Sequence, residues 1–292
     1  MSLKFKPGTI YMMPVSFGPI WSQQQPWEGG KQMTDHFQPP VVNVVNLTFE
    51  TDRDILENMI PECYTLRDPY VTAAFCEFTN CGWSHGRTYS LVNISCPVHF
   101  KGERDDVDGD YVMVMIENNA DPIIFGREQL GYAKIFCDCP PIQHYENNYI
   151  ARVSAYGFEF LKITLDLSKA PEDPEPVKAN EAKSKGKMQF KYIPKTGELG
   201  EDPALNFTTP EIAYPTMNPK WVRPDDYPYE IMTPQVEWGS GTIEFRDPTW
   251  EDWPTFGNVG HGLAQLPVKR VLCARHVVYN DPAEYTAMYR LR

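Results

Sequence analysis

Strand-like segments follow one another so closely along this sequence that they restrict the fold more than any other feature. The segment VVNVVNLTFET at 41–51 has the β-branched content and bounded length of a largely buried strand. From Tyr70 onward YVTAAFCEFT, TYSLVNISCPVHF and DYVMVMIE continue the pattern, and VKRVLCARHVVY returns to it near the end. We therefore predict the α+β class, mainly antiparallel β, with a closed or cone-like β-barrel and few short helices.

Two short helices interrupt this pattern. In TDRDILENMIPE, Thr51 or Asp52 can cap a helix, apolar residues recur at helical spacing, and Pro61 ends it. The segment PAEYTAMYRL at 282–291 predicts a second, terminal helix.

The remaining segments are irregular by composition. Residues 1–40 are rich in Gln, Gly, Pro and Trp, which predicts an irregular N-terminal arm. Residues 169–187 are charged and carry prolines, and strand-like MQFKYIP follows directly, so we predict an exposed charged loop there. At 292 residues the chain has room for one large domain or two ordinary ones.

The charge and the cysteine content restrict the partners. A formal charge of −12 repels phosphate backbones and anionic lipids, so we expect no nucleic acid and no membrane partner. The N-terminal segment lacks the apolar core of a signal peptide, and we expect a cytoplasmic protein. The seven cysteines then predict reduced, mostly buried thiols.

Motifs for cofactors are missing. The sequence has no Gly-rich phosphate loop, dinucleotide fingerprint, nucleophile elbow or paired CxxC, so we expect no cofactor. Cys137, Cys139 and His144 form a C-x-C-x4-H arrangement with three potential zinc ligands. The alternative, which we favour, is two cysteines on one strand face and a histidine in a polar loop, with no metal.

Several other polar residues have both a functional and an ordinary interpretation. His85 and Arg87 lie in the loop NCGWSHGRTY, where they face either a cleft or solvent. Glu77 sits inside an apolar strand, as a buried carboxylate with raised pKa or on a solvent-facing edge. Lys134 in IIFGREQLGYAKIFCD is surrounded by apolar residues, so it either extends to water or loses its charge by desolvation.

This last segment resembles the active-site region of acetoacetate decarboxylases, where a GRE triplet precedes a Tyr-Pro-Lys or Phe-Pro-Lys turn. The match here is Gly126-Arg127-Glu128, followed by Tyr132-Ala133-Lys134. Similar blocks are VNLTFETDRDILENMIPECYTLRDPYV, CPVHFKG, DGDYVMVMIENNADPIIFGRE and LPVKRVLCARHVV, which cover most of the chain from about residue 42 onward. The resemblance implies a single domain over 1–292, a cone-like barrel, a homo-oligomer, and an apolar pocket around Lys134.

The resemblance also implies the chemistry, and it indicates which residues of the family are replaced in this sequence. Lys134 is the residue that forms an imine with a ketone. The family's second lysine is replaced by Ile135, so desolvation must activate Lys134, with Arg127 as a remote cation. Leu91 stands where the family has a catalytic glutamate, and Val42 where it has an arginine near the pocket.

These replacements determine the remaining acid–base and binding candidates. Ala74 stands where the family has a second acidic residue. We therefore expect Glu128 and Glu77, with Tyr89, to transfer protons beside Lys134. The expected substrate-binding residues are Arg127, Tyr132, Tyr89, Leu91 and Val42.

Three functions fit this sequence. The first is a Schiff-base carbon–carbon lyase, decarboxylase-like or retro-aldol, acting on a small-molecule oxo acid larger and more apolar than acetoacetate. The second is a dehydratase, hydratase or aldolase-dehydratase that uses the same lysine. The third is a non-catalytic ligand-binding pseudoenzyme.

Overall fold

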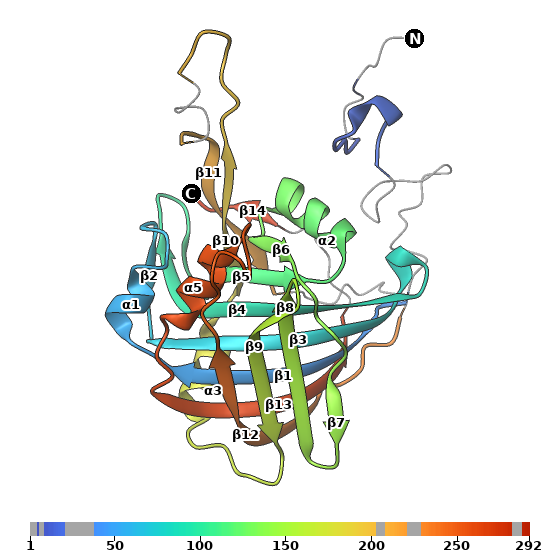
Figure 1. Ribbon diagram of the computed structural model, residues 1–292, viewed down its shortest axis with the longest axis vertical. Coiled ribbons are helices and arrows are strands. Elements are labelled where there is room, and N and C mark those ends of the chain that lie inside the picture. The colour runs from blue at the N-terminus through green and yellow to red at the C-terminus, as the bar shows by residue number, and fades with distance from the viewer. Residues whose placement is uncertain (1–4, 6–8, 21–37, 203–207, 221–228, 282–287) are drawn as a thin grey trace.

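The computed structural model describes residues 5, 9–20, 38–202, 208–220, 229–281 and 288–292 (Figure 1). The strands are β1 (Val41–Glu50), β2 (Tyr64–Leu66), β3 (Tyr70–Cys81), β4 (Arg87–Lys101), β5 (Asp106–Glu117), β6 (Lys134–Phe136), β7 (Gln143–Tyr145), β8 (Asn148–Ala155), β9 (Phe158–Asp166), β10 (Gly186–Pro194), β11 (Pro210–Pro219), β12 (Gln235–Phe245), β13 (Arg270–Asn280) and β14 (Tyr289–Arg290). The helices are α1 (Arg53–Glu57), α2 (Ala120–Phe125), α3 (Glu175–Lys183) and α5 (Gly257–Ala264), with 3-10 turns η1 (Val15–Phe17) and η3 (Gly82–Ser84) and a π-helical turn η4 (Gly126–Leu130).

Hydrogen bonds join these strands into one large sheet. The order is β14-β11-β10-β5-β4-β3-β1-β13-β12-β9-β8-β7, with β2 attached to β4 and β6 to β5. Only the β5–β6 and β5–β10 pairs are parallel among the described strands. The mainly antiparallel α+β prediction is therefore confirmed. The order runs from β14 to β7 without a pairing that joins these two strands in the described chain, so closure of the barrel stays a prediction.

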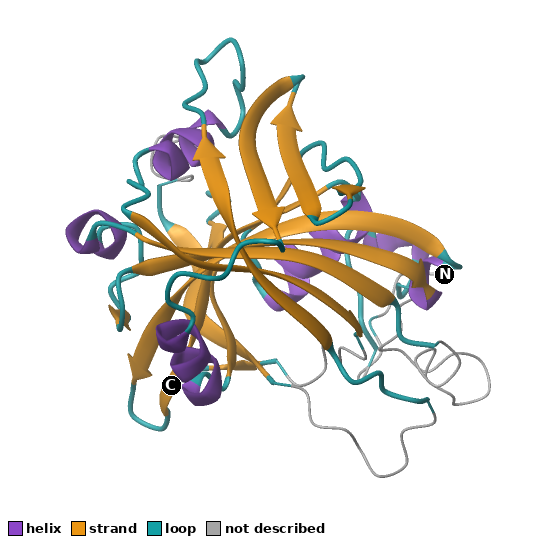
Figure 2. Ribbon diagram, turned by 90° about the horizontal axis from the view of Figure 1, so that it is seen from below, coloured by secondary structure: helices purple, strands orange, loops and turns teal. Residues whose placement is uncertain are grey.

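The main core lies between two parts of this sheet. In Figure 1 the strands β8 and β9 cross the long strands β1, β3 and β4, and Figure 2 shows those long strands as a curved, twisted layer. One apolar cluster joins residues of both parts, such as Phe49 and Phe75 with Phe160 and Ile163. Because successive strand residues point to opposite sides, this core takes alternate residues of the long strands.

A second side of the long strands carries the other alternate residues. A separate apolar cluster there contains Val42, Val44, Cys76, Tyr89 and Leu91. The burial of both sides explains why β1 reads as a nearly continuous apolar run rather than as a simple alternation.

The predicted helices have different outcomes. Helix α1 is confirmed, and the Asp52 carboxylate caps it by accepting from the backbone N–H groups of Asp54 and Ile55. In the segment 282–291, residues 282–287 lie outside the described residues. Tyr289–Arg290 form strand β14 rather than a helix, because they pair with β11.

The predicted loop at 169–187 is wrong in its central part, which forms helix α3. Val177 packs into a small cluster with Tyr70 and Leu272, and Asn180 is buried. The predicted irregular arm at 1–40 falls largely outside the described residues, and η1 is the regular element described within it. No helix in the described part of the chain is long and apolar enough to cross a membrane.

Candidate active site

Lys134 begins β6, directly after a compact helical segment. The Asn119 side chain caps α2 by accepting from the Asp121 N–H, and α2 continues into η4. The turn ends at Gly131, whose φ of +79° lies in the left-handed region that favours glycine. The chain then reverses into β6, which pairs in parallel with β5 so that Met115 and Lys134 are partners.

We call the second side of strands β1, β3, β4, β5, β6 and β13, which bears the Val42–Leu91 cluster, the lysine face. Met115 packs against this cluster and also against a neighbouring cluster of Val112, Leu130 and Tyr132. Since Met115 and Lys134 are partners in the sheet, they point to the same side. The Lys134 side chain therefore lies on the lysine face, between two apolar clusters.

The Lys134 amine is buried and makes few polar contacts. The residue is only 6 % exposed. Its Nζ lies 2.9 Å from Glu117 Oε1, donates to the Pro122 carbonyl at 3.1 Å, and sits 5.4 Å from the ring centre of Tyr132. The amine is thus held beside one carboxylate in surroundings that are otherwise largely apolar.

Glu117 ends β5 and is fully buried. Neither of its oxygens has a hydrogen-bond partner of good geometry among the described residues, so the 2.9 Å contact with Lys134 is its main polar interaction. Burial raises the pKa of Glu117, while the neighbouring Lys134 opposes that rise. Glu117 is therefore the carboxylate placed to exchange a proton with a group bound at Lys134.

Two cations hold the backbone around this pair. Arg127 donates from NH1 to the Lys134 carbonyl at 2.8 Å. Lys191 on β10 is itself buried, and its Nζ donates to the Glu128 and Gln129 carbonyls of η4 at 2.6 and 3.1 Å. Burial lowers the pKa of Lys191, with Glu128 opposing the shift. These contacts fix the turn that precedes Lys134.

The structure brings several of the predicted binding residues to the lysine face. Leu91 on β4 is directly opposite Glu117 on β5. Val42 and Tyr89 lie further along the same side, in the cluster with Leu91. Tyr132 is buried beside Lys134, its hydroxyl accepts from Asn218 Nδ2 at 3.0 Å, and burial raises its pKa to about 12.

Two predicted catalytic carboxylates are not in contact with Lys134. Glu77 accepts from Asn43 Nδ2 and from the Ile142 N–H, and it lies on the opposite side of β3 from the lysine face. Because successive residues of a strand point to opposite sides, the Glu77 side chain points away from the lysine face. Glu128 contributes its backbone carbonyl to Lys191, and its carboxylate makes no ion pair with Lys134 among the described residues.

The remaining polar candidates do not gather into a site. Within the described residues, no three His, Cys, Asp or Glu side chains are placed to hold a metal. Cys137 and Cys139 are buried, and burial raises the pKa of Cys137 to about 12. His144 stacks on Tyr149 at 4.0 Å. His85 and Arg87 follow the turn after β3, and Arg87 donates to the Ser84 carbonyl.

Sequence reasoning missed Glu117, the only carboxylate within ion-pair distance of Lys134 among the described residues. It ends the apolar strand pattern DYVMVMIE, where a charged residue reads as the solvent-exposed end of a strand. The sequence contained one indication of its position. Glu117 lies two residues after Met115, and residues two apart point to the same side of a strand, here β5. That signal becomes useful only when β5 is known to pair with β6.

Comparison with solved structures places this architecture among the acetoacetate decarboxylase folds. An acetoacetate decarboxylase from Legionella pneumophila subsp. pneumophila str. Philadelphia 1 matches with a TM-score of 0.59 at 16% identity, covering 88% of each chain. The enduracididine biosynthesis enzyme MppR, solved with pyruvate, matches with a TM-score of 0.55 at 14% identity, covering 84% of this chain and 88% of that one. An acetoacetate decarboxylase-like enzyme from Sphingomonas wittichii RW1 matches with a TM-score of 0.55 at 12% identity, covering 82% and 88%.

The family model described as acetoacetate decarboxylase (ADC) matches residues 22–286. This chain belongs to that family. A comparison with curated protein sequences finds no match.

Proposed function

We propose that this protein is a Schiff-base carbon–carbon lyase that acts on an oxo acid through Lys134. The observation that carries the proposal is the buried Lys134–Glu117 pair at 2.9 Å on an apolar face. A lysine needs a free amine to attack a ketone, and a neighbouring carboxylate is the group that can accept its proton. Family membership supports enzymatic chemistry on a small molecule.

The proposed reaction uses the two residues in turn. Glu117 takes a proton from the Lys134 ammonium, and the free amine attacks the ketone carbon. Glu117 returns the proton to the hydroxyl that leaves as water, which gives a protonated imine. The imine then accepts the electron pair released when the neighbouring carbon–carbon bond breaks, and hydrolysis restores the lysine.

Two versions of the bond-breaking step fit the same residues. In decarboxylation, carbon dioxide leaves, Glu117 takes up a proton from solvent water, and it passes that proton to the carbon of the resulting enamine. In the retro-aldol version, Glu117 removes the proton of a hydroxyl group as the bond breaks. MppR has been solved with the condensation product of pyruvate and imidazole 4-carboxaldehyde, which supports including aldol-type chemistry and dehydration by the same lysine. The predicted homo-oligomer and cytoplasmic location stay part of this proposal.

Reductive trapping tests the central step. The protein is incubated with pyruvate or a panel of larger oxo acids and then with borohydride, which converts an imine into a stable secondary amine. Trypsin does not cut after a modified lysine, so the labelled peptide should run from Glu128 to Arg152 and carry the mass on Lys134. The buried Lys191 is an internal control and should stay unlabelled.

Labelling spread over surface lysines, or no labelling with any of the oxo acids, would contradict the proposed enzymatic function. Either result would favour a ligand-binding pseudoenzyme.

A further inference from the structure

A row of side chains crosses the lysine face at the level of Lys134. The pairings of neighbouring strands connect Arg275 to Asn46, Asn46 to Ala74, Ala74 to Asn93, Asn93 to Met115, and Met115 to Lys134. Residues paired in this way point to the same side of a sheet. We call these six residues the lysine row.

The row contains buried polar atoms without partners. Asn46 is 7 % exposed, and its Oδ1 has no hydrogen-bond partner among the described residues. The same holds for the buried Oδ1 of Asn93 and Nε of Arg275. A buried polar atom without a partner costs free energy, so three of them in one row need an explanation.

The protein satisfies a comparable amide on the opposite side of the same strand. Asn43 donates from Nδ2 to Glu77 at 3.0 Å, and its Oδ1 contacts His276 Nε2 at 2.7 Å. Asn43 is thus bonded at both ends within the fold. Asn46 and Asn93 keep hydrogen-bonding capacity unused, and they do so on the side that bears the candidate catalytic lysine.

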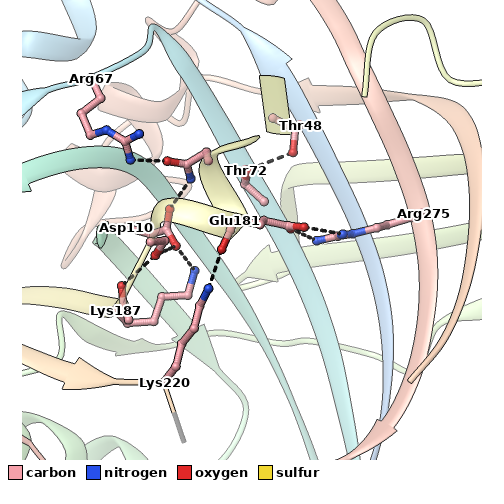
Figure 3. A network of polar contacts seen from close by, with 11 residues as sticks. Thr48, Arg67, Thr72, Asp110, Glu181, Lys187, Lys220 and Arg275 are labelled. Carbon is pink, nitrogen blue, oxygen red and sulfur yellow. Dashed lines mark hydrogen bonds and ion pairs between the residues drawn. The ribbon is translucent and has the colours of Figure 1, made fainter. Parts of the chain in front are cut away.

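The lysine row offers a ligand uncharged amides rather than an unpaired charge. The terminal nitrogens of Arg275 both bind the Glu181 carboxylate of α3, as Figure 3 shows. The same α3 is anchored by Asn180, which donates to Asp110 and accepts from Arg67. Because Glu181 neutralises Arg275, the amides of the row fit an uncharged group such as a hydroxyl. An amide can donate or accept by rotating, so either direction of hydrogen bond is available.

We propose that Asn93 and Asn46 are specificity-determining residues that bind an uncharged oxygen substituent, chiefly a hydroxyl, on the body of the oxo substrate. This inference rests on the proposed imine at Lys134 and names the class of compound that forms it. Ala74 lies between Asn46 and Asn93 in the row and has only a methyl side chain, so no polar side chain of the row separates the two amides. Neighbouring strands lie about 4.8 Å apart, so Asn93 is roughly 10 Å from Lys134 between Cα atoms.

A pair of ketones that differ by one hydroxyl tests this assignment. Benzylacetone and its para-hydroxylated analogue share a ketone and an aromatic body, and the hydroxyl lies at the far end from the ketone. Dissociation constants are measured by calorimetry on the native protein and on Lys134→Met, where no imine forms at this position. We expect the hydroxylated ketone to bind about three- to tenfold more tightly, the increment of one neutral hydrogen bond.

Matched asparagine variants separate recognition from stability. Asn93→Leu and Asn46→Leu replace amides that lack a partner, so both should keep or raise Tm and should remove the preference for the hydroxyl. Asn43→Leu breaks two hydrogen bonds within the fold, so it should lower Tm and retain the preference. The three variants make the same chemical change.

Equal binding of the two ketones, or a preference that persists in Asn93→Leu and Asn46→Leu, would overturn the assignment. A fall in Tm in those two variants as large as in Asn43→Leu would also overturn it, because the amides would then be structural. The calorimetry does not depend on the imine. If trapping fails but the hydroxylated ketone still binds more tightly, only the proposed function is refuted. If trapping succeeds but the two ketones bind equally, only the role of Asn93 and Asn46 is refuted.

Discussion

At the scale of single residues, the pairing of Lys134 with Glu117 makes Glu117 the acid–base group of the proposed reaction. Glu117→Gln keeps the shape of the side chain and removes its ability to transfer a proton. We expect kcat to fall about 10²- to 10⁴-fold, the usual contribution of a general acid or base. Borohydride labelling of Lys134 should persist at a reduced rate.

Glu128→Gln is the matched control for this change, because the Glu128 carboxylate makes no ion pair with Lys134 among the described residues. Its kcat should stay within a few-fold of the native value, an effect of about 1 kcal/mol or less. A larger fall in kcat for Glu128→Gln than for Glu117→Gln would instead support Glu128 as the acid–base residue, as the sequence predicts.

The raised pKa of Glu117 also has a consequence for stability. Burial raises this pKa above 4.5, so at higher pH the native state keeps a proton that the unfolded state has released. Stability contributed by this protonation is fully present below pH 4.5 and is lost as pH rises through the raised pKa. In Lys134→Met, where the opposing cation is gone, Tm should therefore fall with rising pH more steeply than in Lys134→Met/Glu117→Gln. Parallel Tm curves of the two variants from pH 4 upward would contradict this account.

The sequence indicates Lys134 as the candidate lysine but does not indicate Glu117 as its partner. Lys134 lies in a local motif, Gly126-Arg127-Glu128 to Lys134, that can be recognised without a structure. Glu117 and Asn93 come to the same face only through the pairing of β4, β5 and β6. Such contacts depend on register, and a shift of one residue would turn every side chain to the other side.

At the scale of elements, the junction of α2 and η4 leaves space for the lysine at Gly126. A Cβ built on Gly126 would lie 2.5 Å from Lys134 Cδ, 2.6 Å from Cε and 2.9 Å from Nζ. The backbone of Gly126 is helical, with φ of −62°, so alanine suits its conformation and would favour a helix by about 1 kcal/mol. Gly126→Ala should thus fold normally yet displace Lys134 and abolish imine trapping.

Gly262→Ala in α5 is the control, since its Cβ would meet nothing within 4 Å. This variant should match the native protein in trapping and equal or exceed it in Tm. Undiminished labelling of Gly126→Ala would show that the lysine reacts from another position.

Lys191 connects β10 to the end of η4, and its removal tests how far that turn positions Lys134. Lys191→Met keeps the length of the side chain and leaves the Glu128 and Gln129 carbonyls without their donor. We expect a loss of about 1–3 kcal/mol in the free energy of unfolding and a lower rate of imine formation. Denaturant unfolding and trapping rates measure the two effects, and an unchanged trapping rate would limit Lys191 to stability.

Helix α3 shows why one element could not be predicted. Its sequence EPVKANEAK has little apolar content and follows prolines, which is typical of a loop. Polar contacts with strands far away in sequence help to hold it, namely Asn180 to Asp110 and Arg275 to Glu181 (Figure 3). Because those partners come from β13 and β5, no local pattern indicates the helix.

At the scale of the whole molecule, the strand pattern predicts the class of fold well, and closure of the barrel stays a prediction. β-branched and aromatic residues at 41–50 and 70–101 specify long strands whichever neighbours they take. Whether β14 and β7 meet depends on sheet curvature, which arises from many small twists rather than from any single residue. Structures of this fold persist at 14% and 16% identity, in line with cores that tolerate substitution when volume and pattern are kept.

The last prediction concerns which substrates the lysine face favours. Acetoacetate is small and anionic, so its orientation requires a cation or hydrogen-bond donor near the imine. Leu91 stands directly opposite Glu117, and Val42 lies in the same apolar cluster, so these residues give shape without charge. A longer or aromatic oxo compound gains about 0.8 kcal/mol per buried methylene on such a face. Steady-state assays should therefore show poor turnover of acetoacetate and faster turnover of the larger compound, with Lys134→Ala inactive on both. Efficient decarboxylation of acetoacetate would instead mean that Arg127, which now holds the Lys134 carbonyl, orients the substrate carboxylate as well.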